Sequence, residues 1–132
     1  HQRPRPFLIN GDAICTPDDR ELLKTDGSYP SGHSAIGWGW ALILSQLAPE
    51  RAEALLARGR DYARSRMVCN VHWMSDTEAG MTVGAAAFAR LQNNELFQVT
   101  MAAARAELSS ASASAPDADA CEQEAATLAL SD

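Results

Sequence analysis

The sequence contains little positive charge and no long apolar run, and these two shortages exclude whole classes of protein. Lys24 is the only lysine and the formal net charge is −6, so the chain lacks the basic surface with which proteins bind nucleic acid. The longest apolar run lies around Ala41–Leu44 and is far shorter than the roughly 20 residues of a transmembrane helix. We therefore expect neither a nucleic-acid partner nor a membrane span.

Cysteine is also scarce, and its residues are far apart. Cys15, Cys69 and Cys121 include no Cys-x-x-Cys pair of the kind that binds zinc, which disfavours a metal site. One disulfide and one remaining thiol is the simple arrangement in an oxidising compartment. The first six residues have neither an initiator Met nor the apolar stretch of a signal peptide, so we expect a processed or trimmed chain.

Alanine is abundant, whereas β-branched and aromatic residues are few, and this composition favours helices over strands. A chain of 132 residues has room for one domain with a modest core. Apolar periodicity and turn residues predict helices at residues 18–23, 31–47, 49–69, 74–92 and 95–108, after a turn-rich start. On the helix at 49–69 we expect a buried stripe made of Ala54, Leu55, Ala57, Tyr62 and Met67.

The chain is expected to divide into an all-α domain over residues 1–108 and a tail over residues 109–132. The tail is rich in Ser, Ala and Asp, which predicts disorder with weak helix near residues 122–130. Small residues in the helix at 74–92 permit close contact with another helix. Helices with conspicuous Gly and Ala faces usually need further helices to pack against those faces. We therefore predict an all-α bundle that is incomplete in this chain.

Two short segments contain side chains that could bind and cleave a phosphate ester. Ser31 and Gly32 lie where a loop enters a helix, and the free N–H groups of a helix N-terminus bind anions. His33, in the first turn, could donate a proton to a leaving alkoxide. The ordinary alternatives are an N-cap serine and a surface histidine.

The second segment contains an arginine, a histidine and an aspartate. His72 and Asp76 are four residues apart, so on one helix they would share a face, and Asp76 could accept the Nδ1 proton while Nε2 attacks phosphorus. Arg66 could hold two phosphate oxygens. The alternatives are a helix-stabilising His–Asp pair, a metal site that has only His1 as a further imidazole, and a solvated arginine.

Together these residues resemble two signature motifs of the type 2 phosphatidic acid phosphatase superfamily, namely Ser31-Gly32-His33 and then Ser65-Arg66, five residues, His72, three residues, Asp76. The match is closest to the class A bacterial non-specific acid phosphatases of that superfamily. Further matching segments are Arg5-Pro6-Phe7, Gly27-Ser28-Tyr29-Pro30 and Ile36-Gly37-Trp38. The resemblance covers the chain from about Arg5 to Leu108.

The resemblance implies an all-α core of the acid phosphatase and vanadium haloperoxidase type. It also implies hydrolysis of small phosphomonoesters at acidic pH without metal or cofactor, in the periplasm or as a secreted protein. Transfer of phosphate to alcohols and assembly into homo-oligomers are compatible with the match.

The same match implies a role for each motif residue. His72 is the nucleophile that forms a phosphohistidine, Asp76 orients it, and His33 is the general acid. The residues that bind phosphate oxygens would be Arg5, Ser31, Gly32 and Arg66. Cys15 would pair with Cys69.

The chain also departs from the family pattern. The family's first motif contains a lysine seven positions before the arginine of Arg-Pro, and counting from Arg5 places it three residues upstream of His1. Arg3-Pro4 is a competing match, but Phe7 favours Arg5. We expect this part of the bundle to need the N-terminal half, from the same protein or from a cleaved companion chain. Asn70-Val71 departs from the residues common in the class and leaves the substrate preference open.

Three other interpretations compete with a phosphatase. A vanadate-dependent haloperoxidase has a similar site, because vanadate mimics the transition state of phosphoryl transfer, but the short Ser65–Asp76 spacing favours the phosphatase. A membrane lipid phosphatase is disfavoured by the lack of spanning helices. An inactive fragment is the non-enzyme alternative, because it would lack the upstream lysine and the N-terminal helices.

Overall fold

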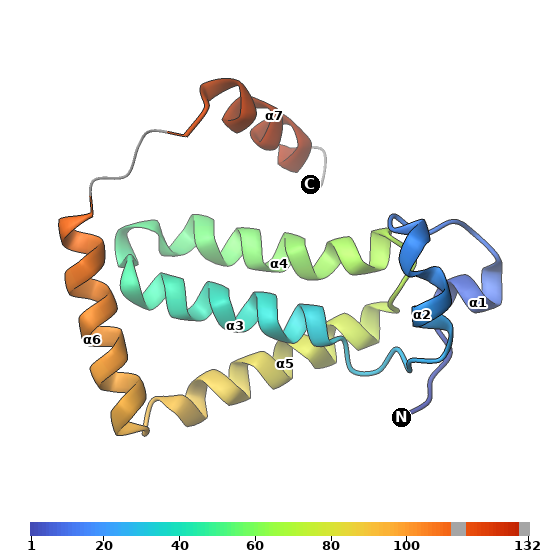
Figure 1. The fold of residues 1–132 in the computed structure, drawn as a ribbon, viewed down its shortest axis with the longest axis horizontal. Helices are drawn as coiled ribbons and strands as arrows, with labels where there is room; N and C mark the ends of the chain where they lie inside the picture. Colours follow the sequence, from blue (N-terminus) through green and yellow to red (C-terminus); the bar gives the residue numbers. More distant parts are fainter. Residues whose placement is uncertain (112–115, 130–132) are drawn as a thin grey trace. The chain divides into compact units, whose positions relative to one another are not determined.

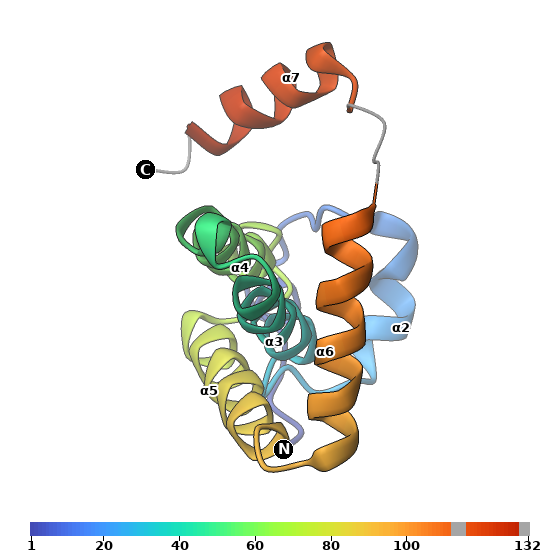
Figure 2. The same ribbon diagram turned by 90° about the vertical axis from the view of Figure 1, so that its left-hand side faces the viewer.

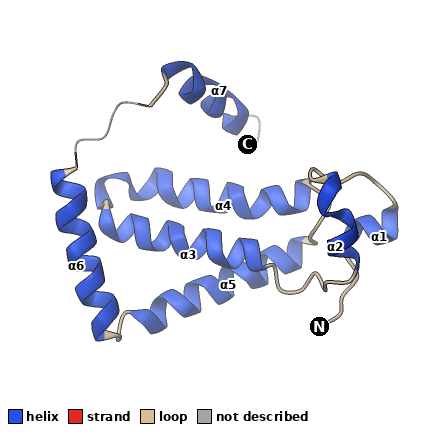
Figure 3. Cartoon of the chain, viewed as in Figure 1, coloured by secondary structure: helices blue, strands red, loops and turns tan. Residues whose placement is uncertain are grey.

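The computed structural model describes residues 1–111 and 116–129, and over these residues it contains helices and turns but no strand (Figures 1 and 3). The predicted all-α fold is confirmed. The chain forms two compact units, His1–Asn94 and Glu95–Asp132. The first unit contains all the predicted catalytic and phosphate-binding residues.

Five helices make up the first unit. They are α1 at Pro6–Asn10, α2 at Arg20–Lys24, α3 at Gly32–Leu47, α4 at Ala52–Val68 and α5 at Met74–Leu91, with single 3-10 turns at Pro17–Asp19 and Pro49–Arg51. The four helices predicted for this region are therefore present, and their ends differ by only a few residues. The short α1 was not predicted, because one turn is too short for an apolar period, although Pro6 opens it and Gly11, with φ of 75°, ends it.

Helix α3 lies between α4 and α5 and packs along both, whereas α4 and α5 contact each other much less (Figure 2). Glycines make this close packing possible. A side chain at Gly59 of α4 would collide with Ala41 of α3, and a side chain at Gly80 of α5 would collide with the carbonyl oxygen of Ser31. The contact at Gly80 brings the first turns of α5 against the start of α3.

The predicted apolar stripe of α4 is wrong for most of its residues. Ala54, Tyr62 and Met67 are exposed, whereas the buried residues of this helix are Gly59 and Ala63. The backbones of α3 and α4 approach so closely that only the smallest side chains fit between them. The larger apolar residues of α4 therefore lie beside this contact and not in it.

An apolar face on α3 is exposed. Ile36, Trp40 and Leu44 have exposed fractions of 57%, 65% and 45%, and with Leu55 of α4 they line a groove of about 460 Å³. The expectation that the bundle is incomplete stays a prediction. None of the helices in the described part of the chain has both the length and the apolarity that crossing a membrane requires.

A small core and a disulfide hold the N-terminal segment against the loop that follows α4. Phe7 and Val71 belong to one buried cluster. The predicted disulfide between Cys15 and Cys69 is present, with 5.0 Å between the two Cα atoms. Arg5, two residues before Phe7, is thereby held next to His72.

The second unit contains α6 at Glu95–Ser110 and α7 at Ala118–Ala129. Helix α6 agrees with the helix predicted at 95–108, and α7 covers most of the region where weak helix was predicted. Residues 112–115 and 130–132 of the expected disordered tail lie outside the described residues. The two units divide after Asn94, so a domain boundary after residue 108 stays a prediction. Cys121 in α7 is an exposed free thiol.

Candidate active site

A cleft of about 590 Å³ lies where the N-terminal segment meets the start of α3 and the end of α4. Five of the seven predicted catalytic and phosphate-binding residues line it, namely Arg5, Gly32, His33, Arg66 and His72. The other two, Ser31 and Asp76, are fully buried next to these lining residues. The fold therefore gathers side chains from three separate parts of the sequence around one cavity.

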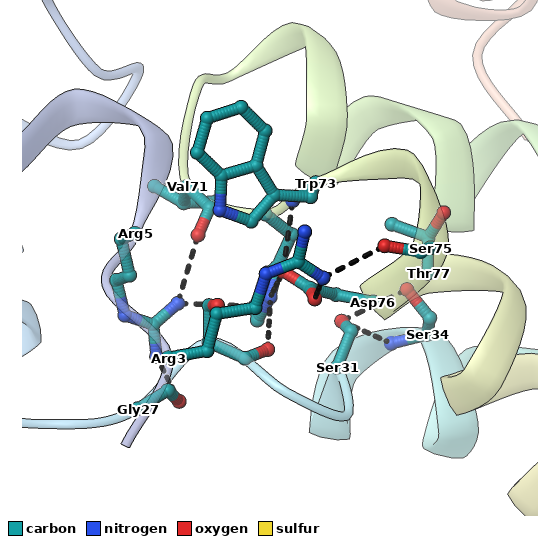
Figure 4. A network of polar contacts seen from close by, with 12 residues as sticks. Arg3, Arg5, Gly27, Ser31, Ser34, Val71, Trp73, Ser75, Asp76 and Thr77 are labelled. Carbon is teal, nitrogen blue, oxygen red and sulfur yellow. Dashed lines mark hydrogen bonds and ion pairs between the residues drawn. The ribbon is translucent and has the colours of Figure 1, made fainter. Parts of the chain in front are cut away.

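Helix α3 presents its N-terminus to the cleft. Ser31 is the N-cap, and its Oγ accepts hydrogen bonds from the Ser34 N–H at 3.2 Å and from the Ser34 hydroxyl at 2.9 Å (Figure 4). The Ser31 N–H donates to the carbonyl oxygen of Asp76 at 3.0 Å. Ser31 thus builds the helix start, and its contact with phosphate stays a prediction. Gly32 has open space where a side chain would be and lines the cleft with the backbone of the first turn.

Both ring nitrogens of the buried His72 have partners. Nδ1 lies 2.8 Å from the carbonyl oxygen of Ser28, and Nε2 lies 3.1 Å from Nη1 of Arg5. A carbonyl oxygen only accepts and a guanidinium only donates, so Nδ1 carries the proton and Nε2 carries the lone pair. His72 is therefore in the tautomer that a nucleophilic Nε2 requires.

Nδ1 of His72 makes its hydrogen bond to Ser28 and not, as expected, to Asp76, so the orienting role of Asp76 stays a prediction. Oδ2 of Asp76 lies 3.7 Å from Nδ1 and instead accepts the N–H of Trp73 at 2.9 Å. Oδ1 pairs with Nη1 of Arg3 at 2.7 Å (Figure 4). Helix α5 begins at Met74 with Trp73 as its N-cap, so His72 lies just before the helix and not inside it, although its ring is still close to Asp76.

The backbone at the end of α4 carries His72 into the cleft. Helix α4 ends at Val68, and Asn70 turns the chain in a left-handed conformation with φ of 60°. The carbonyl oxygen of Arg66 then accepts the N–H groups of Val71 and His72, each at 3.2 Å. Arg66 and His72 are therefore held together by the main chain.

Two arginines give the cleft its positive charge. Arg5 lines the cleft, whereas the competing Arg3 does not. The Arg5 side chain is buried. It donates to the carbonyl oxygen of Val71 at 3.0 Å and to the exposed carboxylate of Asp26 at 2.8 Å. Nε of Arg66 is buried and has no hydrogen-bond partner in the described part of the chain. Buried N–H groups normally have an acceptor, so this N–H is available to an acceptor atom in the cleft, and the binding of phosphate by Arg66 stays a prediction. Among the described residues, no three His, Cys, Asp or Glu side chains are grouped so as to hold a metal ion.

The pKa values of both cleft histidines are lowered from the ordinary value. Burial is the main cause for His72, and the charge of Arg5 lowers its pKa further, while a nearby carbonyl and carboxylate offset part of this. For His33 the main cause is again desolvation, followed by the charge of Arg66. Both rings are therefore neutral at more acidic pH than an ordinary histidine.

Three residues that contact the site were not predicted. Ser28 provides a carbonyl oxygen to His72, Asp26 pairs with Arg5, and Arg3 pairs with a buried carboxylate. A backbone acceptor leaves no signal in residue types, and an exposed aspartate is common. The repeated Arg-Pro dipeptide is the one signal that could have identified Arg3.

Comparison with known proteins finds one family. A family model described as the PAP2 superfamily matches residues 1–95.

A non-specific acid phosphatase of Salmonella typhi is 48% identical over 108 residues, which are 82% of this chain and 43% of that protein. An acid phosphatase of Zymomonas mobilis subsp. mobilis is 45% identical over 117 residues, 89% of this chain and 44% of that protein. A non-specific acid phosphatase of Providencia stuartii is 43% identical over 107 residues, 81% and 43% of the two chains. The chain thus spans less than half the length of these relatives.

Proposed function

The chain belongs to the PAP2 superfamily, and from that premise we propose that its cleft is the phosphate site of an acid phosphatase. The observation that carries the proposal is the state of His72, whose unprotonated Nε2 lies 3.1 Å from the Arg5 guanidinium in a cleft that also contains the unpartnered Nε of Arg66. A nucleophile beside cationic donors is what phosphoryl transfer requires. The relatives named as acid phosphatases support the same chemistry.

In the first step, the phosphate oxygens bind to Arg5, Arg66 and the N–H of Gly32. Nε2 of His72 attacks phosphorus, so that a P–N bond forms while the P–O bond to the leaving group breaks. His33 donates its proton to the departing oxygen, and an alcohol leaves. The product on the protein is a phosphohistidine at His72.

Two groups already in place stabilise the positive charge that forms on the imidazole. The Ser28 carbonyl oxygen accepts a hydrogen bond from Nδ1 of His72 at 2.8 Å. The buried Asp76 carboxylate lies 3.7 Å from the same nitrogen. In the second step, water attacks phosphorus, the P–N bond breaks, and the now neutral His33 takes a proton from the water. An alcohol in place of water would accept the phosphate by the same route.

The setting of the reaction follows from other features of the chain. The Cys15–Cys69 disulfide supports an oxidising compartment, either the periplasm or the outside of the cell. The arginines and His33 supply the charge and the proton that the reaction needs, and so we propose that no metal is used. The upstream lysine and the N-terminal half expected from the family would complete the site.

A chromogenic phosphomonoester tests the proposed activity. The protein should hydrolyse p-nitrophenyl phosphate at the same rate with and without a chelator. Turnover that a chelator abolishes would contradict the mechanism. Halide oxidation with vanadate and peroxide, in the absence of phosphatase activity, would favour the haloperoxidase instead.

The pH profile of kcat/KM should be a bell whose maximum is displaced to acidic pH. His72 attacks only when neutral, and its lowered pKa extends activity to lower pH. His33 acts only when protonated, and its lowered pKa makes activity decline earlier as the pH rises. The measurement is kcat/KM across the acidic and neutral range, because this ratio reports the free enzyme. The His33→Gln variant should lose the alkaline limb, and an unchanged bell in that variant would contradict its assigned role.

A further inference from the structure

Arg3 lies next to the site but does not line the cleft. Its Nη1 is 2.7 Å from Oδ1 of Asp76 and 2.7 Å from Oγ of Ser75 (Figure 4). The Arg3 side chain is 39% exposed, whereas the Asp76 side chain is fully buried. Arg3 is thus paired with the buried carboxylate that lies 3.7 Å from Nδ1 of His72.

The backbone of Arg3 reaches the other partner of His72. The carbonyl oxygen of Arg3 accepts a hydrogen bond from the N–H of Ser28 at 2.9 Å. The carbonyl oxygen of Ser28 in turn accepts a hydrogen bond from Nδ1 of His72 at 2.8 Å. The guanidinium carbon of Arg3 also lies 5.5 Å from the centre of the Trp73 ring, whose Nε1 donates to the Pro4 carbonyl at 2.9 Å. The segment that contains Arg3 is therefore fixed on both sides.

We propose that Arg3 is a positioning residue for His72. It holds the Asp76 carboxylate 3.7 Å from Nδ1, so that Nδ1 keeps its proton and donates it in a hydrogen bond to the Ser28 carbonyl, and Nε2 keeps its lone pair for phosphorus. The proposal rests on the proposed function in its catalytic part, because the step that Arg3 serves is attack by Nε2. The pairing itself is independent of the reaction.

The charges around His72 give the direction of the effect. Arg5 and Arg66 face the ring and oppose its protonation, and Asp76 favours protonation. Arg3 pairs with Asp76 at 2.7 Å and so offsets part of the effect of this carboxylate on the ring. Without Arg3, the buried carboxylate would have no paired cation, and the adjacent imidazole would become its best partner. The pKa of His72 should then rise, and more of the protein would hold a protonated, unreactive ring.

Kinetics of the Arg3→Gln variant in the full chain test the catalytic part. The kcat should fall by about 10²-fold, the size of effect that a misplaced reacting group produces, while KM changes little because Arg5 and Arg66 still bind phosphate. The acid limb of kcat/KM should move to higher pH. The Arg3→Lys variant, which keeps the charge, should restore part of the rate. Ser75→Ala removes the other acceptor of Nη1 and should leave both kcat and the pH profile unchanged.

An NMR titration of the His72 ring tests the pairing without any activity. In Arg3→Gln the midpoint of the His72 titration should move to higher pH, and in an Asp76→Asn background the same substitution should move it no further. An unmoved midpoint, or an equal shift in the Asp76→Asn background, would overturn the proposal. If Arg3→Gln fails to fold, the double variant Arg3→Gln with Asp76→Asn is used, because it leaves no buried charge unpaired. Its His72 midpoint is compared with that of Asp76→Asn alone, and the two midpoints should be equal. A protein that hydrolyses no phosphomonoester yet shows the shift would refute the function and retain the pairing.

Discussion

Replacing His72 by alanine should lower kcat for phosphomonoester hydrolysis by about 10⁴-fold or more, because the P–N bond of the intermediate can no longer form. Arg5 and Arg66 remain in the cleft, so inorganic phosphate should still bind. We expect a large loss in kcat with an inhibition constant for phosphate that changes far less. Steady-state kinetics with phosphate as inhibitor give both numbers, and a melting curve shows whether the variant is folded.

His1 provides a matched control for this variant. It also lines the cleft, but its ring packs edge-on against Tyr29, with 5.4 Å between the ring centres. His1→Ala should therefore keep the kcat of the unmodified protein. A folded His72→Ala variant with normal turnover, or a His1→Ala variant that loses it, would show that the nucleophile has been assigned to the wrong ring.

The second large effect is expected at Arg66. Replacing it by glutamine should lower kcat/KM by about 10²–10³-fold, the loss that follows removal of one preorganised donor to a transition-state oxyanion. The reason lies in its Nε, which is buried beside the cleft without a partner in the described residues and so is available to a phosphate oxygen. The Arg66→Lys variant should recover little, because an ammonium group cannot reproduce the planar fork of a guanidinium.

Arg64 lies two residues earlier on α4 and is exposed. Arg64→Gln changes the net charge by the same amount, so it separates a local contact from a general loss of positive charge. Its kcat/KM should equal that of the unmodified protein. Equal losses in the Arg64 and Arg66 variants would mean that Arg66 acts only through long-range charge.

Much of the fold could be predicted because it depends on local sequence signals. Apolar periodicity and the positions of proline and glycine predicted the ranges of α3, α4, α5 and α6. The cleft residues could be identified because their types and spacing are specific in combination, although each is common alone. Ser31 also has the N-cap role that was its ordinary alternative, so one residue fits both interpretations.

The remaining features depend on contacts between distant segments. The acceptor for Nδ1 of His72 is the carbonyl oxygen of Ser28, 44 residues away, and residue types do not encode a backbone contact of this kind. The role expected of Asp76 assumed that His72 was inside a helix, whereas the helix starts two residues later. The buried face of α4 was misassigned because Gly59 allows an approach to α3 that apolar periodicity alone does not reveal.

The most direct test of the account is to locate the phosphoryl group during turnover. The protein is mixed with a labelled phosphomonoester, denatured at alkaline pH where phosphohistidine survives, digested, and analysed by mass spectrometry. We predict a phosphoryl group on the peptide that contains His72, released by acid and absent from His72→Ala. Rapid hydrolysis with no phosphoryl group on His72, or with the group on another residue, would contradict the central claim.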